Sequence, residues 1–505
     1  MSALSNLEHN ATKHIRGFLK SHKTEHITVF GYIISLISCL SAGSVMIISL
    51  YSLTWLTKYH YTPLQANLIS SAINIGGYLT PPLLGLLCDS HGPVVLSMTS
   101  IVTYVPHYYI LSRSNSETDF RLIFYCFFMI GIGTSALFFS ALMSCSKFYP
   151  QSKLLSISLP TTSYGISSIW LGYLVTHMDY FKIKEKLQSF ENYLNLSHVY
   201  FFFSCFYLLI GVFDWIAASI VSRLKHELFH GGNKLKKPLQ SHQESSQHQN
   251  YSSLENSSET LHNETEQEPL RPTKTNIKGM MLSFYKDSSA YLLLLVMFVS
   301  IGSMEMYITN MGTITELYDH DVVSIVAKSE SNYDPQKTLA TFSVNSTAIR
   351  IVIGLVIDFF TRKLGFKNVE ITIMFLLLLL GFCSQLLMLT SNRYLALATS
   401  MMGMTYGGLF TTFPVVVLSH WGSEIFGTAY GSCMVAPALG STTFGIVFAR
   451  IFQNNSCSVV DDSCSFRCIG QMFQINAISF IFALAVATFI YFGMWRRKTK
   501  QTVHV

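Results

Sequence analysis

The sequence predicts an all-α membrane protein with twelve transmembrane helices in two six-helix bundles. Composition is the first reason: 50% of the residues are hydrophobic and only 12% are charged, against about 25% charged in a typical soluble domain. The second reason is a series of apolar stretches long enough to cross a bilayer, which takes about 20 residues each. The third is a polar segment that divides these stretches six and six.

The predicted transmembrane helices give the chain five parts. The helices are expected near 29–56, 63–87, 93–112, 121–146, 154–177, 199–222, 288–311, 338–360, 370–390, 394–418, 425–450 and 471–495. The parts are an N-terminal tail (1–28), a first bundle (29–222), a middle loop (223–286), a second bundle (287–495) and a C-terminal tail (496–505). The middle loop is rich in Ser, Gln, Asn, Glu and His, so it cannot bury a core and we expect it to be disordered.

The two bundles read as copies of one another. Three pairs of landmarks recur in the same order at nearly constant separation: Gly85-Leu-Leu-Cys-Asp89 with Gly354-Leu-Val-Ile-Asp358, Leu137-Phe138 with Leu409-Phe410, and Tyr164-Gly165 with Tyr430-Gly431. Internal repeats of this length are typical of secondary transporters, in which the ligand site lies between the halves.

Charge distribution predicts the orientation in the membrane. Lys and Arg gather in both tails and in the middle loop, and cytosolic loops carry such an excess. Long loops contribute little, so the orientation rests mainly on the tails, and we expect both termini in the cytosol. Two N-x-S/T sequons, at Asn195 and Asn454, then face the opposite side and are candidate N-glycosylation sites.

Three cysteines, Cys457, Cys464 and Cys468, share one short loop on that opposite side. An oxidising compartment would pair two of them, and three unpaired thiols are the alternative. No histidine accompanies them, so the spacing does not suggest zinc, and we expect no metal or other cofactor.

Charged residues within membrane spans are costly and rare, which makes each a candidate for substrate binding or coupling. Arg350 presents a planar fork of donors suited to a carboxylate or phosphate, or it forms a fixed ion pair with a buried acid. Glu305 is either a proton carrier, a structural hydrogen-bonding group or the partner of Arg350. Asp214 either lines the cavity or bonds to a neighbouring helix.

The duplicated Gly-x3-Asp element predicts a conformational latch. Glycine allows close helix approach, and an aspartate at a helix end can accept hydrogen bonds from the N-terminus of a neighbouring helix. Such a contact can form in one conformation and break in another. The expected latch residues are Gly85, Asp89, Gly92, Gly354 and Asp358.

Proline and glycine recur within the corresponding fifth and eleventh spans, as Pro160 with Gly165 and Gly431 with Pro437. They kink helices or permit close packing. We expect helix bends there that let the bundles rock, although close packing alone would use the same residues.

Residues 85–93, Gly-Leu-Leu-Cys-Asp-Ser-His-Gly-Pro, resemble the signature loop of the major facilitator superfamily. Both glycines and the aspartate match, whereas Ser90 and Pro93 stand where arginine is usual. The second copy keeps the glycine and the aspartate and is followed by Arg362-Lys363. The resemblance implies the major facilitator fold.

A closer resemblance is to the fungal monocarboxylate-transporter-homologue family. It is carried by Ser41-Ala-Gly-Ser44, Leu79-Thr-Pro-Pro-Leu-Leu-Gly85, Asp89-Ser-His-Gly-Pro93, Leu154-Leu-Ser-Ile-Ser-Leu-Pro-Thr-Thr162, Tyr164-Gly-Ile-Ser-Ser168 and Tyr406-Gly-Gly-Leu-Phe410. It covers nearly every span and implies a vacuolar membrane protein, with the plasma membrane as the alternative. Animal monocarboxylate transporters carry an aspartate one turn before their arginine, where Ser346 stands here. They also use a lysine in the first span, which this chain lacks, and both departures put proton–lactate symport in doubt.

We therefore expect a secondary active transporter that moves a small anionic or zwitterionic metabolite by alternating access, with a proton as co-substrate. Its partners would be that solute, the proton and the lipid bilayer, and we expect a monomer. No span presents a nucleophile–base pair or metal-ligand spacing, and no basic patch suits nucleic acid, so we expect neither an enzyme nor a nucleic-acid-binding protein. The alternative is a membrane sensor that signals through the middle loop, which deletion of residues 235–270 would distinguish from a carrier.

Overall fold

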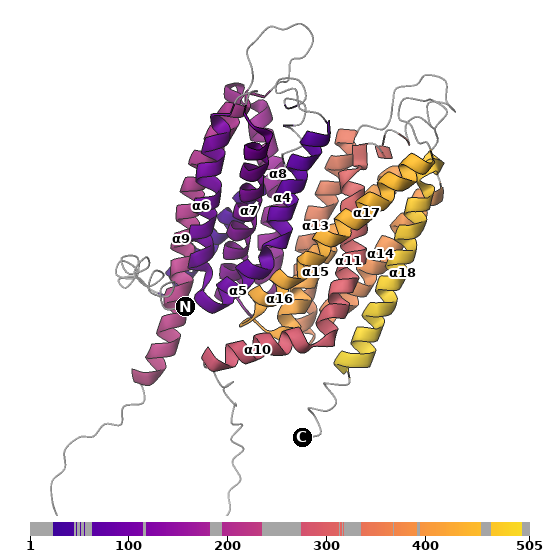
Figure 1. The fold of residues 1–505 in the computed structure, drawn as a ribbon. Coiled ribbons are helices and arrows are strands. Elements are labelled where there is room, and N and C mark those ends of the chain that lie inside the picture. Colours follow the sequence, from indigo (N-terminus) through magenta and orange to yellow (C-terminus); the bar gives the residue numbers. More distant parts are fainter. Residues whose placement is uncertain are drawn as a thin grey trace, which may run out of the picture.

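In the computed structural model, the residues whose positions are described are 24–44, 47, 51, 55, 63–114, 118–181, 194–234, 274–312, 314–315, 317, 335–366, 368–390, 394–455 and 466–496. Every regular element in these ranges is a helix. Figure 1 shows the helices of the first half gathered into one bundle and those of the second half into another beside it. The predicted all-α fold class is confirmed.

The first bundle is built from the N-terminal half of the chain. Its elements are α2 (Thr24–Ser41), α4 (Pro63–Leu79), α5 (Pro81–His91), α6 (Pro93–Ser112), α7 (Phe120–Phe148), the π-helix η2 (Leu154–Ser158), α8 (Leu159–His177), the short 3₁₀ turn η3 (Asp179–Phe181) and α9 (Leu196–Lys234). Its core is aromatic: the rings of Tyr104 and Tyr207 stack at a centroid separation of 3.8 Å.

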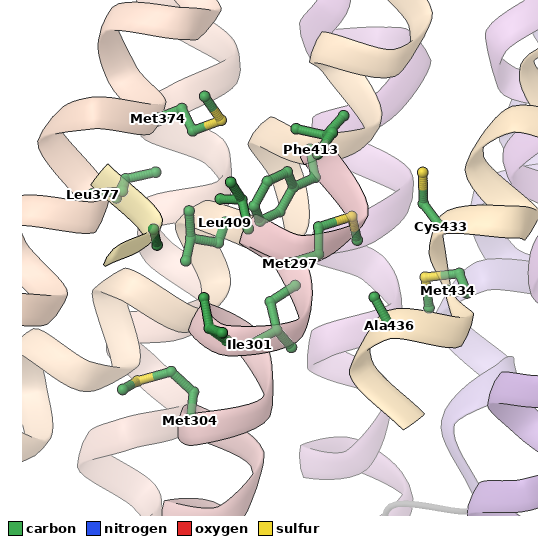
Figure 2. Close-up of a cluster of buried hydrophobic side chains, with 14 of the residues drawn as sticks. Met297, Ile301, Met304, Met374, Leu377, Leu409, Phe413, Cys433, Met434 and Ala436 are labelled. Atoms are coloured by element: carbon green, nitrogen blue, oxygen red, sulfur yellow. The ribbon is translucent and has the colours of Figure 1, made fainter. Parts of the chain in front are cut away.

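The second bundle is built from the C-terminal half. Its elements are α10 (Lys274–Lys286), α11 (Ser288–Thr309), α13 (Pro335–Lys363), α14 (Val369–Thr390), α15 (Leu395–Trp421), α16 (Phe426–Cys433), α17 (Val435–Asn454), the 3₁₀ turn η5 (Phe466–Ile469), α18 (Gly470–Thr488) and the π-helix η6 (Phe489–Trp495). Figure 2 shows α11 inside its core, with Met297 and Ile301 lying between Leu409 of α15 and the α16–α17 junction at Met434.

In the described residues, eleven helices are long and apolar enough to cross a membrane. Two of these spans are helix pairs in series, α4 with α5 and α16 with α17. α8 lies at the predicted fifth span, less apolar than the others, and packs against α2 of its own bundle and α13 of the second. Each predicted apolar stretch thus has a helix or helix pair in the described residues.

Proline explains where these helices break. A proline ring clashes with the carbonyl group four residues earlier and lacks the N–H that would bond to it. Pro437 therefore disfavours a regular bond to Cys433, the residue at which α16 ends. Pro160 acts in the same way on Ser156, which lies within the π-helix. Pro81 and Pro82 begin α5 directly after the break at Thr80.

The predicted middle loop is partly helical, which corrects the expectation of disorder throughout 223–286. α9 continues to Lys234, and α10 begins at Lys274. α10 is held by packing: Phe284 is 2% exposed and its ring lies 5.2 Å from that of Trp421. Figure 1 shows α10 lying across one end of the second bundle. Residues 235–273 lie outside the described residues.

The predicted disulfide and the two predicted glycosylation sites belong to the end of the molecule opposite α10. Cys468 is disulfide-bonded, and its partner lies outside the described residues, as do Cys457 and Cys464. Asn454 is exposed at the end of α17, and Asn195 is partly exposed just before α9. Glycosylation of these two asparagines stays a prediction.

Candidate functional site

The boundary between the bundles is formed in part by α13 and α8. Gly354 of α13 lies so close to Ser158 that a β-carbon at 354 would overlap its side chain. Seven residues beyond Ser158, a β-carbon at Gly165 of α8 would lie 3.5 Å from the Thr347 hydroxyl and 3.7 Å from Cζ of Arg350. Small residues therefore bring the two helices together and leave the guanidinium of Arg350 at the contact.

Arg350 is 7% exposed and joins the two halves through its side chain. Its Nη1 donates a hydrogen bond of 2.8 Å to the backbone carbonyl of Thr161 in α8. Its Nε is buried and has no hydrogen-bond partner among the described residues. No described carboxylate forms a salt bridge with it, so Arg350 pairs with neither Glu305 nor Asp214 here.

Four tyrosines surround the guanidinium within electrostatic range: Tyr78 of α4, Tyr164 of α8, Tyr406 of α15 and Tyr430 of α16. Two of them come from each bundle. Their hydroxyls can donate to or accept from a polar ligand, whereas the guanidinium only donates. The arrangement suits a ligand with one anionic group and further polar groups.

Glu305 of α11 shares Tyr78, Tyr164 and Tyr406 as neighbours with this arginine and is also bonded across the boundary. Its Oε1 accepts a hydrogen bond of 2.8 Å from the Tyr406 hydroxyl and one of 3.2 Å from the Tyr78 hydroxyl. Tyr406 interacts electrostatically with both Glu305 and Arg350. We call Arg350, Glu305 and the four tyrosines the central polar cluster.

Asp214 does not belong to the central polar cluster. It is 0% exposed inside the first bundle, beside the hydroxyls of Ser38 in α2 and Ser140 in α7. The structure thus places Asp214 between helices of its own bundle, away from the central polar cluster. It brings Arg350 and Glu305 together around shared tyrosines.

Sequence reasoning did not single out the four tyrosines as site residues. A signal was available, because each adjoins a glycine: Gly77-Tyr78, Tyr164-Gly165, Tyr406-Gly407 and Tyr430-Gly431. Gly407 and Gly431 lie against backbone of neighbouring helices, at Ser346 and Pro81. Close helix crossings therefore occur directly beside two of the tyrosines that face Arg350.

At the end of the molecule where α10 lies, Asp89 caps a helix of the other bundle. Its Oδ1 accepts a hydrogen bond of 3.1 Å from the Gly427 N–H, and its Oδ2 accepts one of 2.5 Å from the Thr428 N–H, at the start of α16. A β-carbon at Gly85 would overlap the Gly427 carbonyl. Gly92 turns the chain between α5 and α6 at φ 95°, which favours glycine.

Asp358 repeats this contact in the reverse direction. It lies near the end of α13 and accepts hydrogen bonds from the Lys153 N–H at 2.8 Å, from the Leu154 N–H at 3.3 Å and from the Ser152 hydroxyl. These groups begin the fifth helix of the first bundle. Each half therefore extends one aspartate to a helix N-terminus of the other half, where the partial positive charge stabilises a carboxylate.

No group of three or more His, Cys, Asp or Glu residues within the described part of the chain is arranged to hold a metal ion.

Comparison with known proteins agrees with this architecture. The profile of the Major Facilitator Superfamily matches residues 33–445. The chain belongs to the major facilitator superfamily. Within it, the chain is 35% identical to "Probable transporter MCH1" of Saccharomyces cerevisiae, covering 98% of this chain and 99% of that protein. It is 36% identical to the protein of the same name in Eremothecium gossypii, with 98% and 100% covered. The resemblance to the fungal monocarboxylate-transporter homologues is thus confirmed.

Solved structures show the same superfamily fold at low sequence identity. The transporter FucP in the outward conformation matches with a TM-score of 0.57 at 15% identity, covering 91% of this chain and 98% of its own. The proton:xylose symporter XylE matches with a TM-score of 0.53 at 11% identity, covering 93% and 96%. At these identities the likeness concerns the fold alone.

Proposed function

We propose that the protein is a secondary active transporter that moves a small anionic or zwitterionic metabolite across the vacuolar membrane by alternating access, coupled to protons. The observation that carries the proposal is the buried guanidinium of Arg350, placed between the bundles with its Nε unpartnered among the described residues. Superfamily membership supports transport as the general activity. The vacuolar location rests on the family resemblance.

The anionic group of the solute is proposed to bind Arg350. An ion removed from water costs several kcal/mol unless an opposite charge and hydrogen bonds compensate it. The Thr161 carbonyl supplies one acceptor but no charge. A solute carboxylate would supply the missing charge and use two donors of the planar fork. Hydroxyls of the surrounding tyrosines would bind the remaining polar groups of the solute.

Glu305 is proposed to carry the coupled proton. Its side chain is not fully enclosed by the protein, and two tyrosine hydroxyls hold its carboxyl in place. Tyr406 bonds to Glu305 and also interacts with Arg350, so it would transmit a change at either group to the other. Protonation of Glu305 would then be linked to anion binding at Arg350.

The two aspartate contacts are proposed to act as the latch of alternating access. Both lie at the end where α10 lies, and both join one half to the other. The two contacts must break before solute can pass at that end, and they can stay intact while solute passes at the opposite end. The latch would therefore stabilise one of the two conformations.

The test compares vacuoles from cells that carry the native protein, no protein, Arg350→Ala or Arg362→Ala at equal abundance. Arg362 is exposed at the end of the same helix, so its loss controls for removal of a positive charge from α13. We expect the vacuolar content of one small anion to change in the strain without the protein and in the Arg350→Ala strain. The content of that anion should stay normal in the Arg362→Ala strain. Metabolite profiling by mass spectrometry checks this, after a fluorescent fusion has verified the location.

Arg350→Lys sharpens the test, because lysine keeps the charge but lacks the planar fork. We expect it to transport poorly. Normal transport by both Arg350→Ala and Arg350→Lys, with the proteins folded and localised, would rule out Arg350 as the anion site.

A further inference from the structure

The interior of the first bundle contains a carboxyl group that the central polar cluster does not use. Asp214 of α9 is 0% exposed and lies between α2 and α7. The titratable side chains that face it from the packed helices are two thiols, Cys39 of α2 and Cys145 of α7. Among the described residues of α2, α6, α7 and α9, no basic side chain interacts with it. Its negative charge would therefore have no compensating partner there.

Two serines lie beside this carboxyl, but their hydrogens are used elsewhere. The Ser38 hydroxyl donates to the Ile34 carbonyl at 3.1 Å, and the Ser140 hydroxyl donates to the Pro93 carbonyl at 3.2 Å. Consequently neither oxygen of Asp214 accepts a well-aligned hydrogen bond from the described residues. The lone pairs of the serine oxygens remain available. A proton on Asp214 removes the charge and supplies the missing donor.

A row of buried hydroxyls extends from this carboxyl toward the end of the bundle opposite the latch. Ser38 and Ser41 of α2, and Ser44 in the 3₁₀ turn directly after it, follow one another at spacings of three, so they lie on one side. On α9, Tyr207 lies two turns from Asp214 on the same face. The Tyr207 hydroxyl donates to the Ser41 carbonyl at 2.8 Å and lies beside the Ser44 hydroxyl.

The row continues to α6. The hydroxyls of Ser44 and Tyr108 are 3.0 Å apart, and either can donate. A hydroxyl that both donates and accepts can pass a proton along such a row by rotation. The step between Ser38 and Tyr207 spans about one helical turn, which requires an intervening water or a change of serine rotamer.

We propose that Asp214 is a proton-binding site of the first bundle, separate from Glu305, and that the hydroxyls of Tyr207, Ser44 and Tyr108 connect it with the end opposite the latch. In the conformation described here, burial and the two unpartnered oxygens favour the protonated form of this site. The physiological use of this proton rests on the proposed function, whereas its binding does not.

The second bundle provides matched controls. Its last helix also carries a buried polar residue, Asn476, but this amide is neutral and donates to Gln385 at 3.2 Å. The second bundle also has a buried tyrosine on α11, Tyr307, whose hydroxyl is 2.7 Å from that of Thr399. Tyr307→Phe therefore removes a comparable hydrogen bond from a core without an adjoining acid.

The experiment uses the full-length protein, purified and returned to lipid bilayers without solute, and infrared spectroscopy in water and then in D₂O. A protonated carboxylic acid has a carbonyl stretching band distinct from that of a carboxylate, and deuterium shifts it. We expect one such band at neutral pH that Asp214→Asn removes and Glu305→Gln retains. We further expect Tyr207→Phe to slow its deuterium shift several-fold and Tyr307→Phe to leave the rate unchanged.

Each outcome decides a part of the proposal. If the native protein and folded Asp214→Asn showed the same carbonyl bands of protonated carboxyl groups, the proton site would be overturned. Equal exchange rates in Tyr207→Phe and Tyr307→Phe would overturn the route through Tyr207 while leaving the site. Because no solute is present, failure here is distinguishable from failure of Arg350 as the anion site.

Discussion

At the scale of single residues, the uncompensated charge of Arg350 is the main constraint on the central polar cluster. Removing one partner of a buried ion pair costs about 3–5 kcal/mol, because the remaining charge is left without a partner. Arg350 is in that state without any mutation, because its neighbours are tyrosines and a backbone carbonyl. A site that lacks its counter-charge is suited to a ligand that brings one.

Glu305→Gln tests the coupling role of the neighbouring carboxyl. Glutamine keeps an Oε1 that accepts from Tyr78 and Tyr406, so we expect the fold to persist. The amide cannot gain or lose a proton, so uptake driven by a proton gradient should fall about tenfold or more, the effect of about 1.4 kcal/mol. Counterflow of the same solute in proteoliposomes should continue. Unchanged gradient-driven uptake would exclude Glu305 as the coupling group.

The two charged residues of the central polar cluster could be singled out from the sequence, but their hydrogen-bond partners could not. Arg350 and Glu305 stand out in the sequence because charges within apolar spans are rare. Their partners depend on how two bundles meet, and that contact joins residues as far apart in the chain as Tyr78 and Glu305. The sequence pattern also could not separate Asp214 from the cluster, because helix rotation decides which core a side chain enters.

At the scale of elements, glycine allows α5 and α16 to approach closely enough for the latch. A β-carbon at Gly427 would lie 2.7 Å from the Asp89 carboxylate and 2.9 Å from the Gly85 carbonyl. A side chain at either position would separate the two helices and lengthen the hydrogen bonds to Asp89. The glycines and the aspartate therefore act as one unit.

Gly85→Ala tests this unit through a native thiol. Cys88 is 0% exposed on α5, one residue before Asp89. Overpacking costs about 1–3 kcal/mol, so the ratio of latched to unlatched molecules should fall by about fivefold to a hundredfold. Alkylation of Cys88, followed by peptide mass spectrometry, should then accelerate by a similar factor. Cys145, buried within the first bundle, is the internal control and should keep its native rate. Equal rates of Cys88 alkylation in the native protein and in Gly85→Ala would contradict the role of Gly85.

The helices themselves were largely predictable, and their ends were not. Apolar length identifies a span because the bilayer sets it, and α6 has the predicted bounds, 93–112. The helical part of the middle loop was missed because α10 is too short and too polar to be a membrane span, although Ile277, Met280, Met281 and Phe284 recur at helical spacing.

At the scale of the whole molecule, the repeat produces two aspartate contacts, the proposed latches, that are related by exchange of the halves. Asp89 belongs to the first half and bonds to α16 of the second, whereas Asp358 belongs to the second half and bonds to the start of the fifth helix in the first. Both lie at one end, so both stabilise the same conformation. In a two-state protein, weakening either contact should therefore shift the same equilibrium.

Asp89→Asn tests whether the two contacts open as one. Hydrogen bonds to a charged group contribute about 1.5–3 kcal/mol, so the ratio of latched to unlatched molecules should fall by about tenfold to a hundredfold. Hydrogen–deuterium exchange should accelerate at Gly427 and Thr428, which lose their acceptor directly. It should also accelerate at Lys153 and Leu154, whose acceptor Asp358 is unchanged, because the halves separate at that end together. Asp119→Asn, which alters a helix cap at the opposite end, serves as the control. Acceleration confined to Gly427 and Thr428 would mean that the latches open independently, and the closed end would then not behave as a single gate.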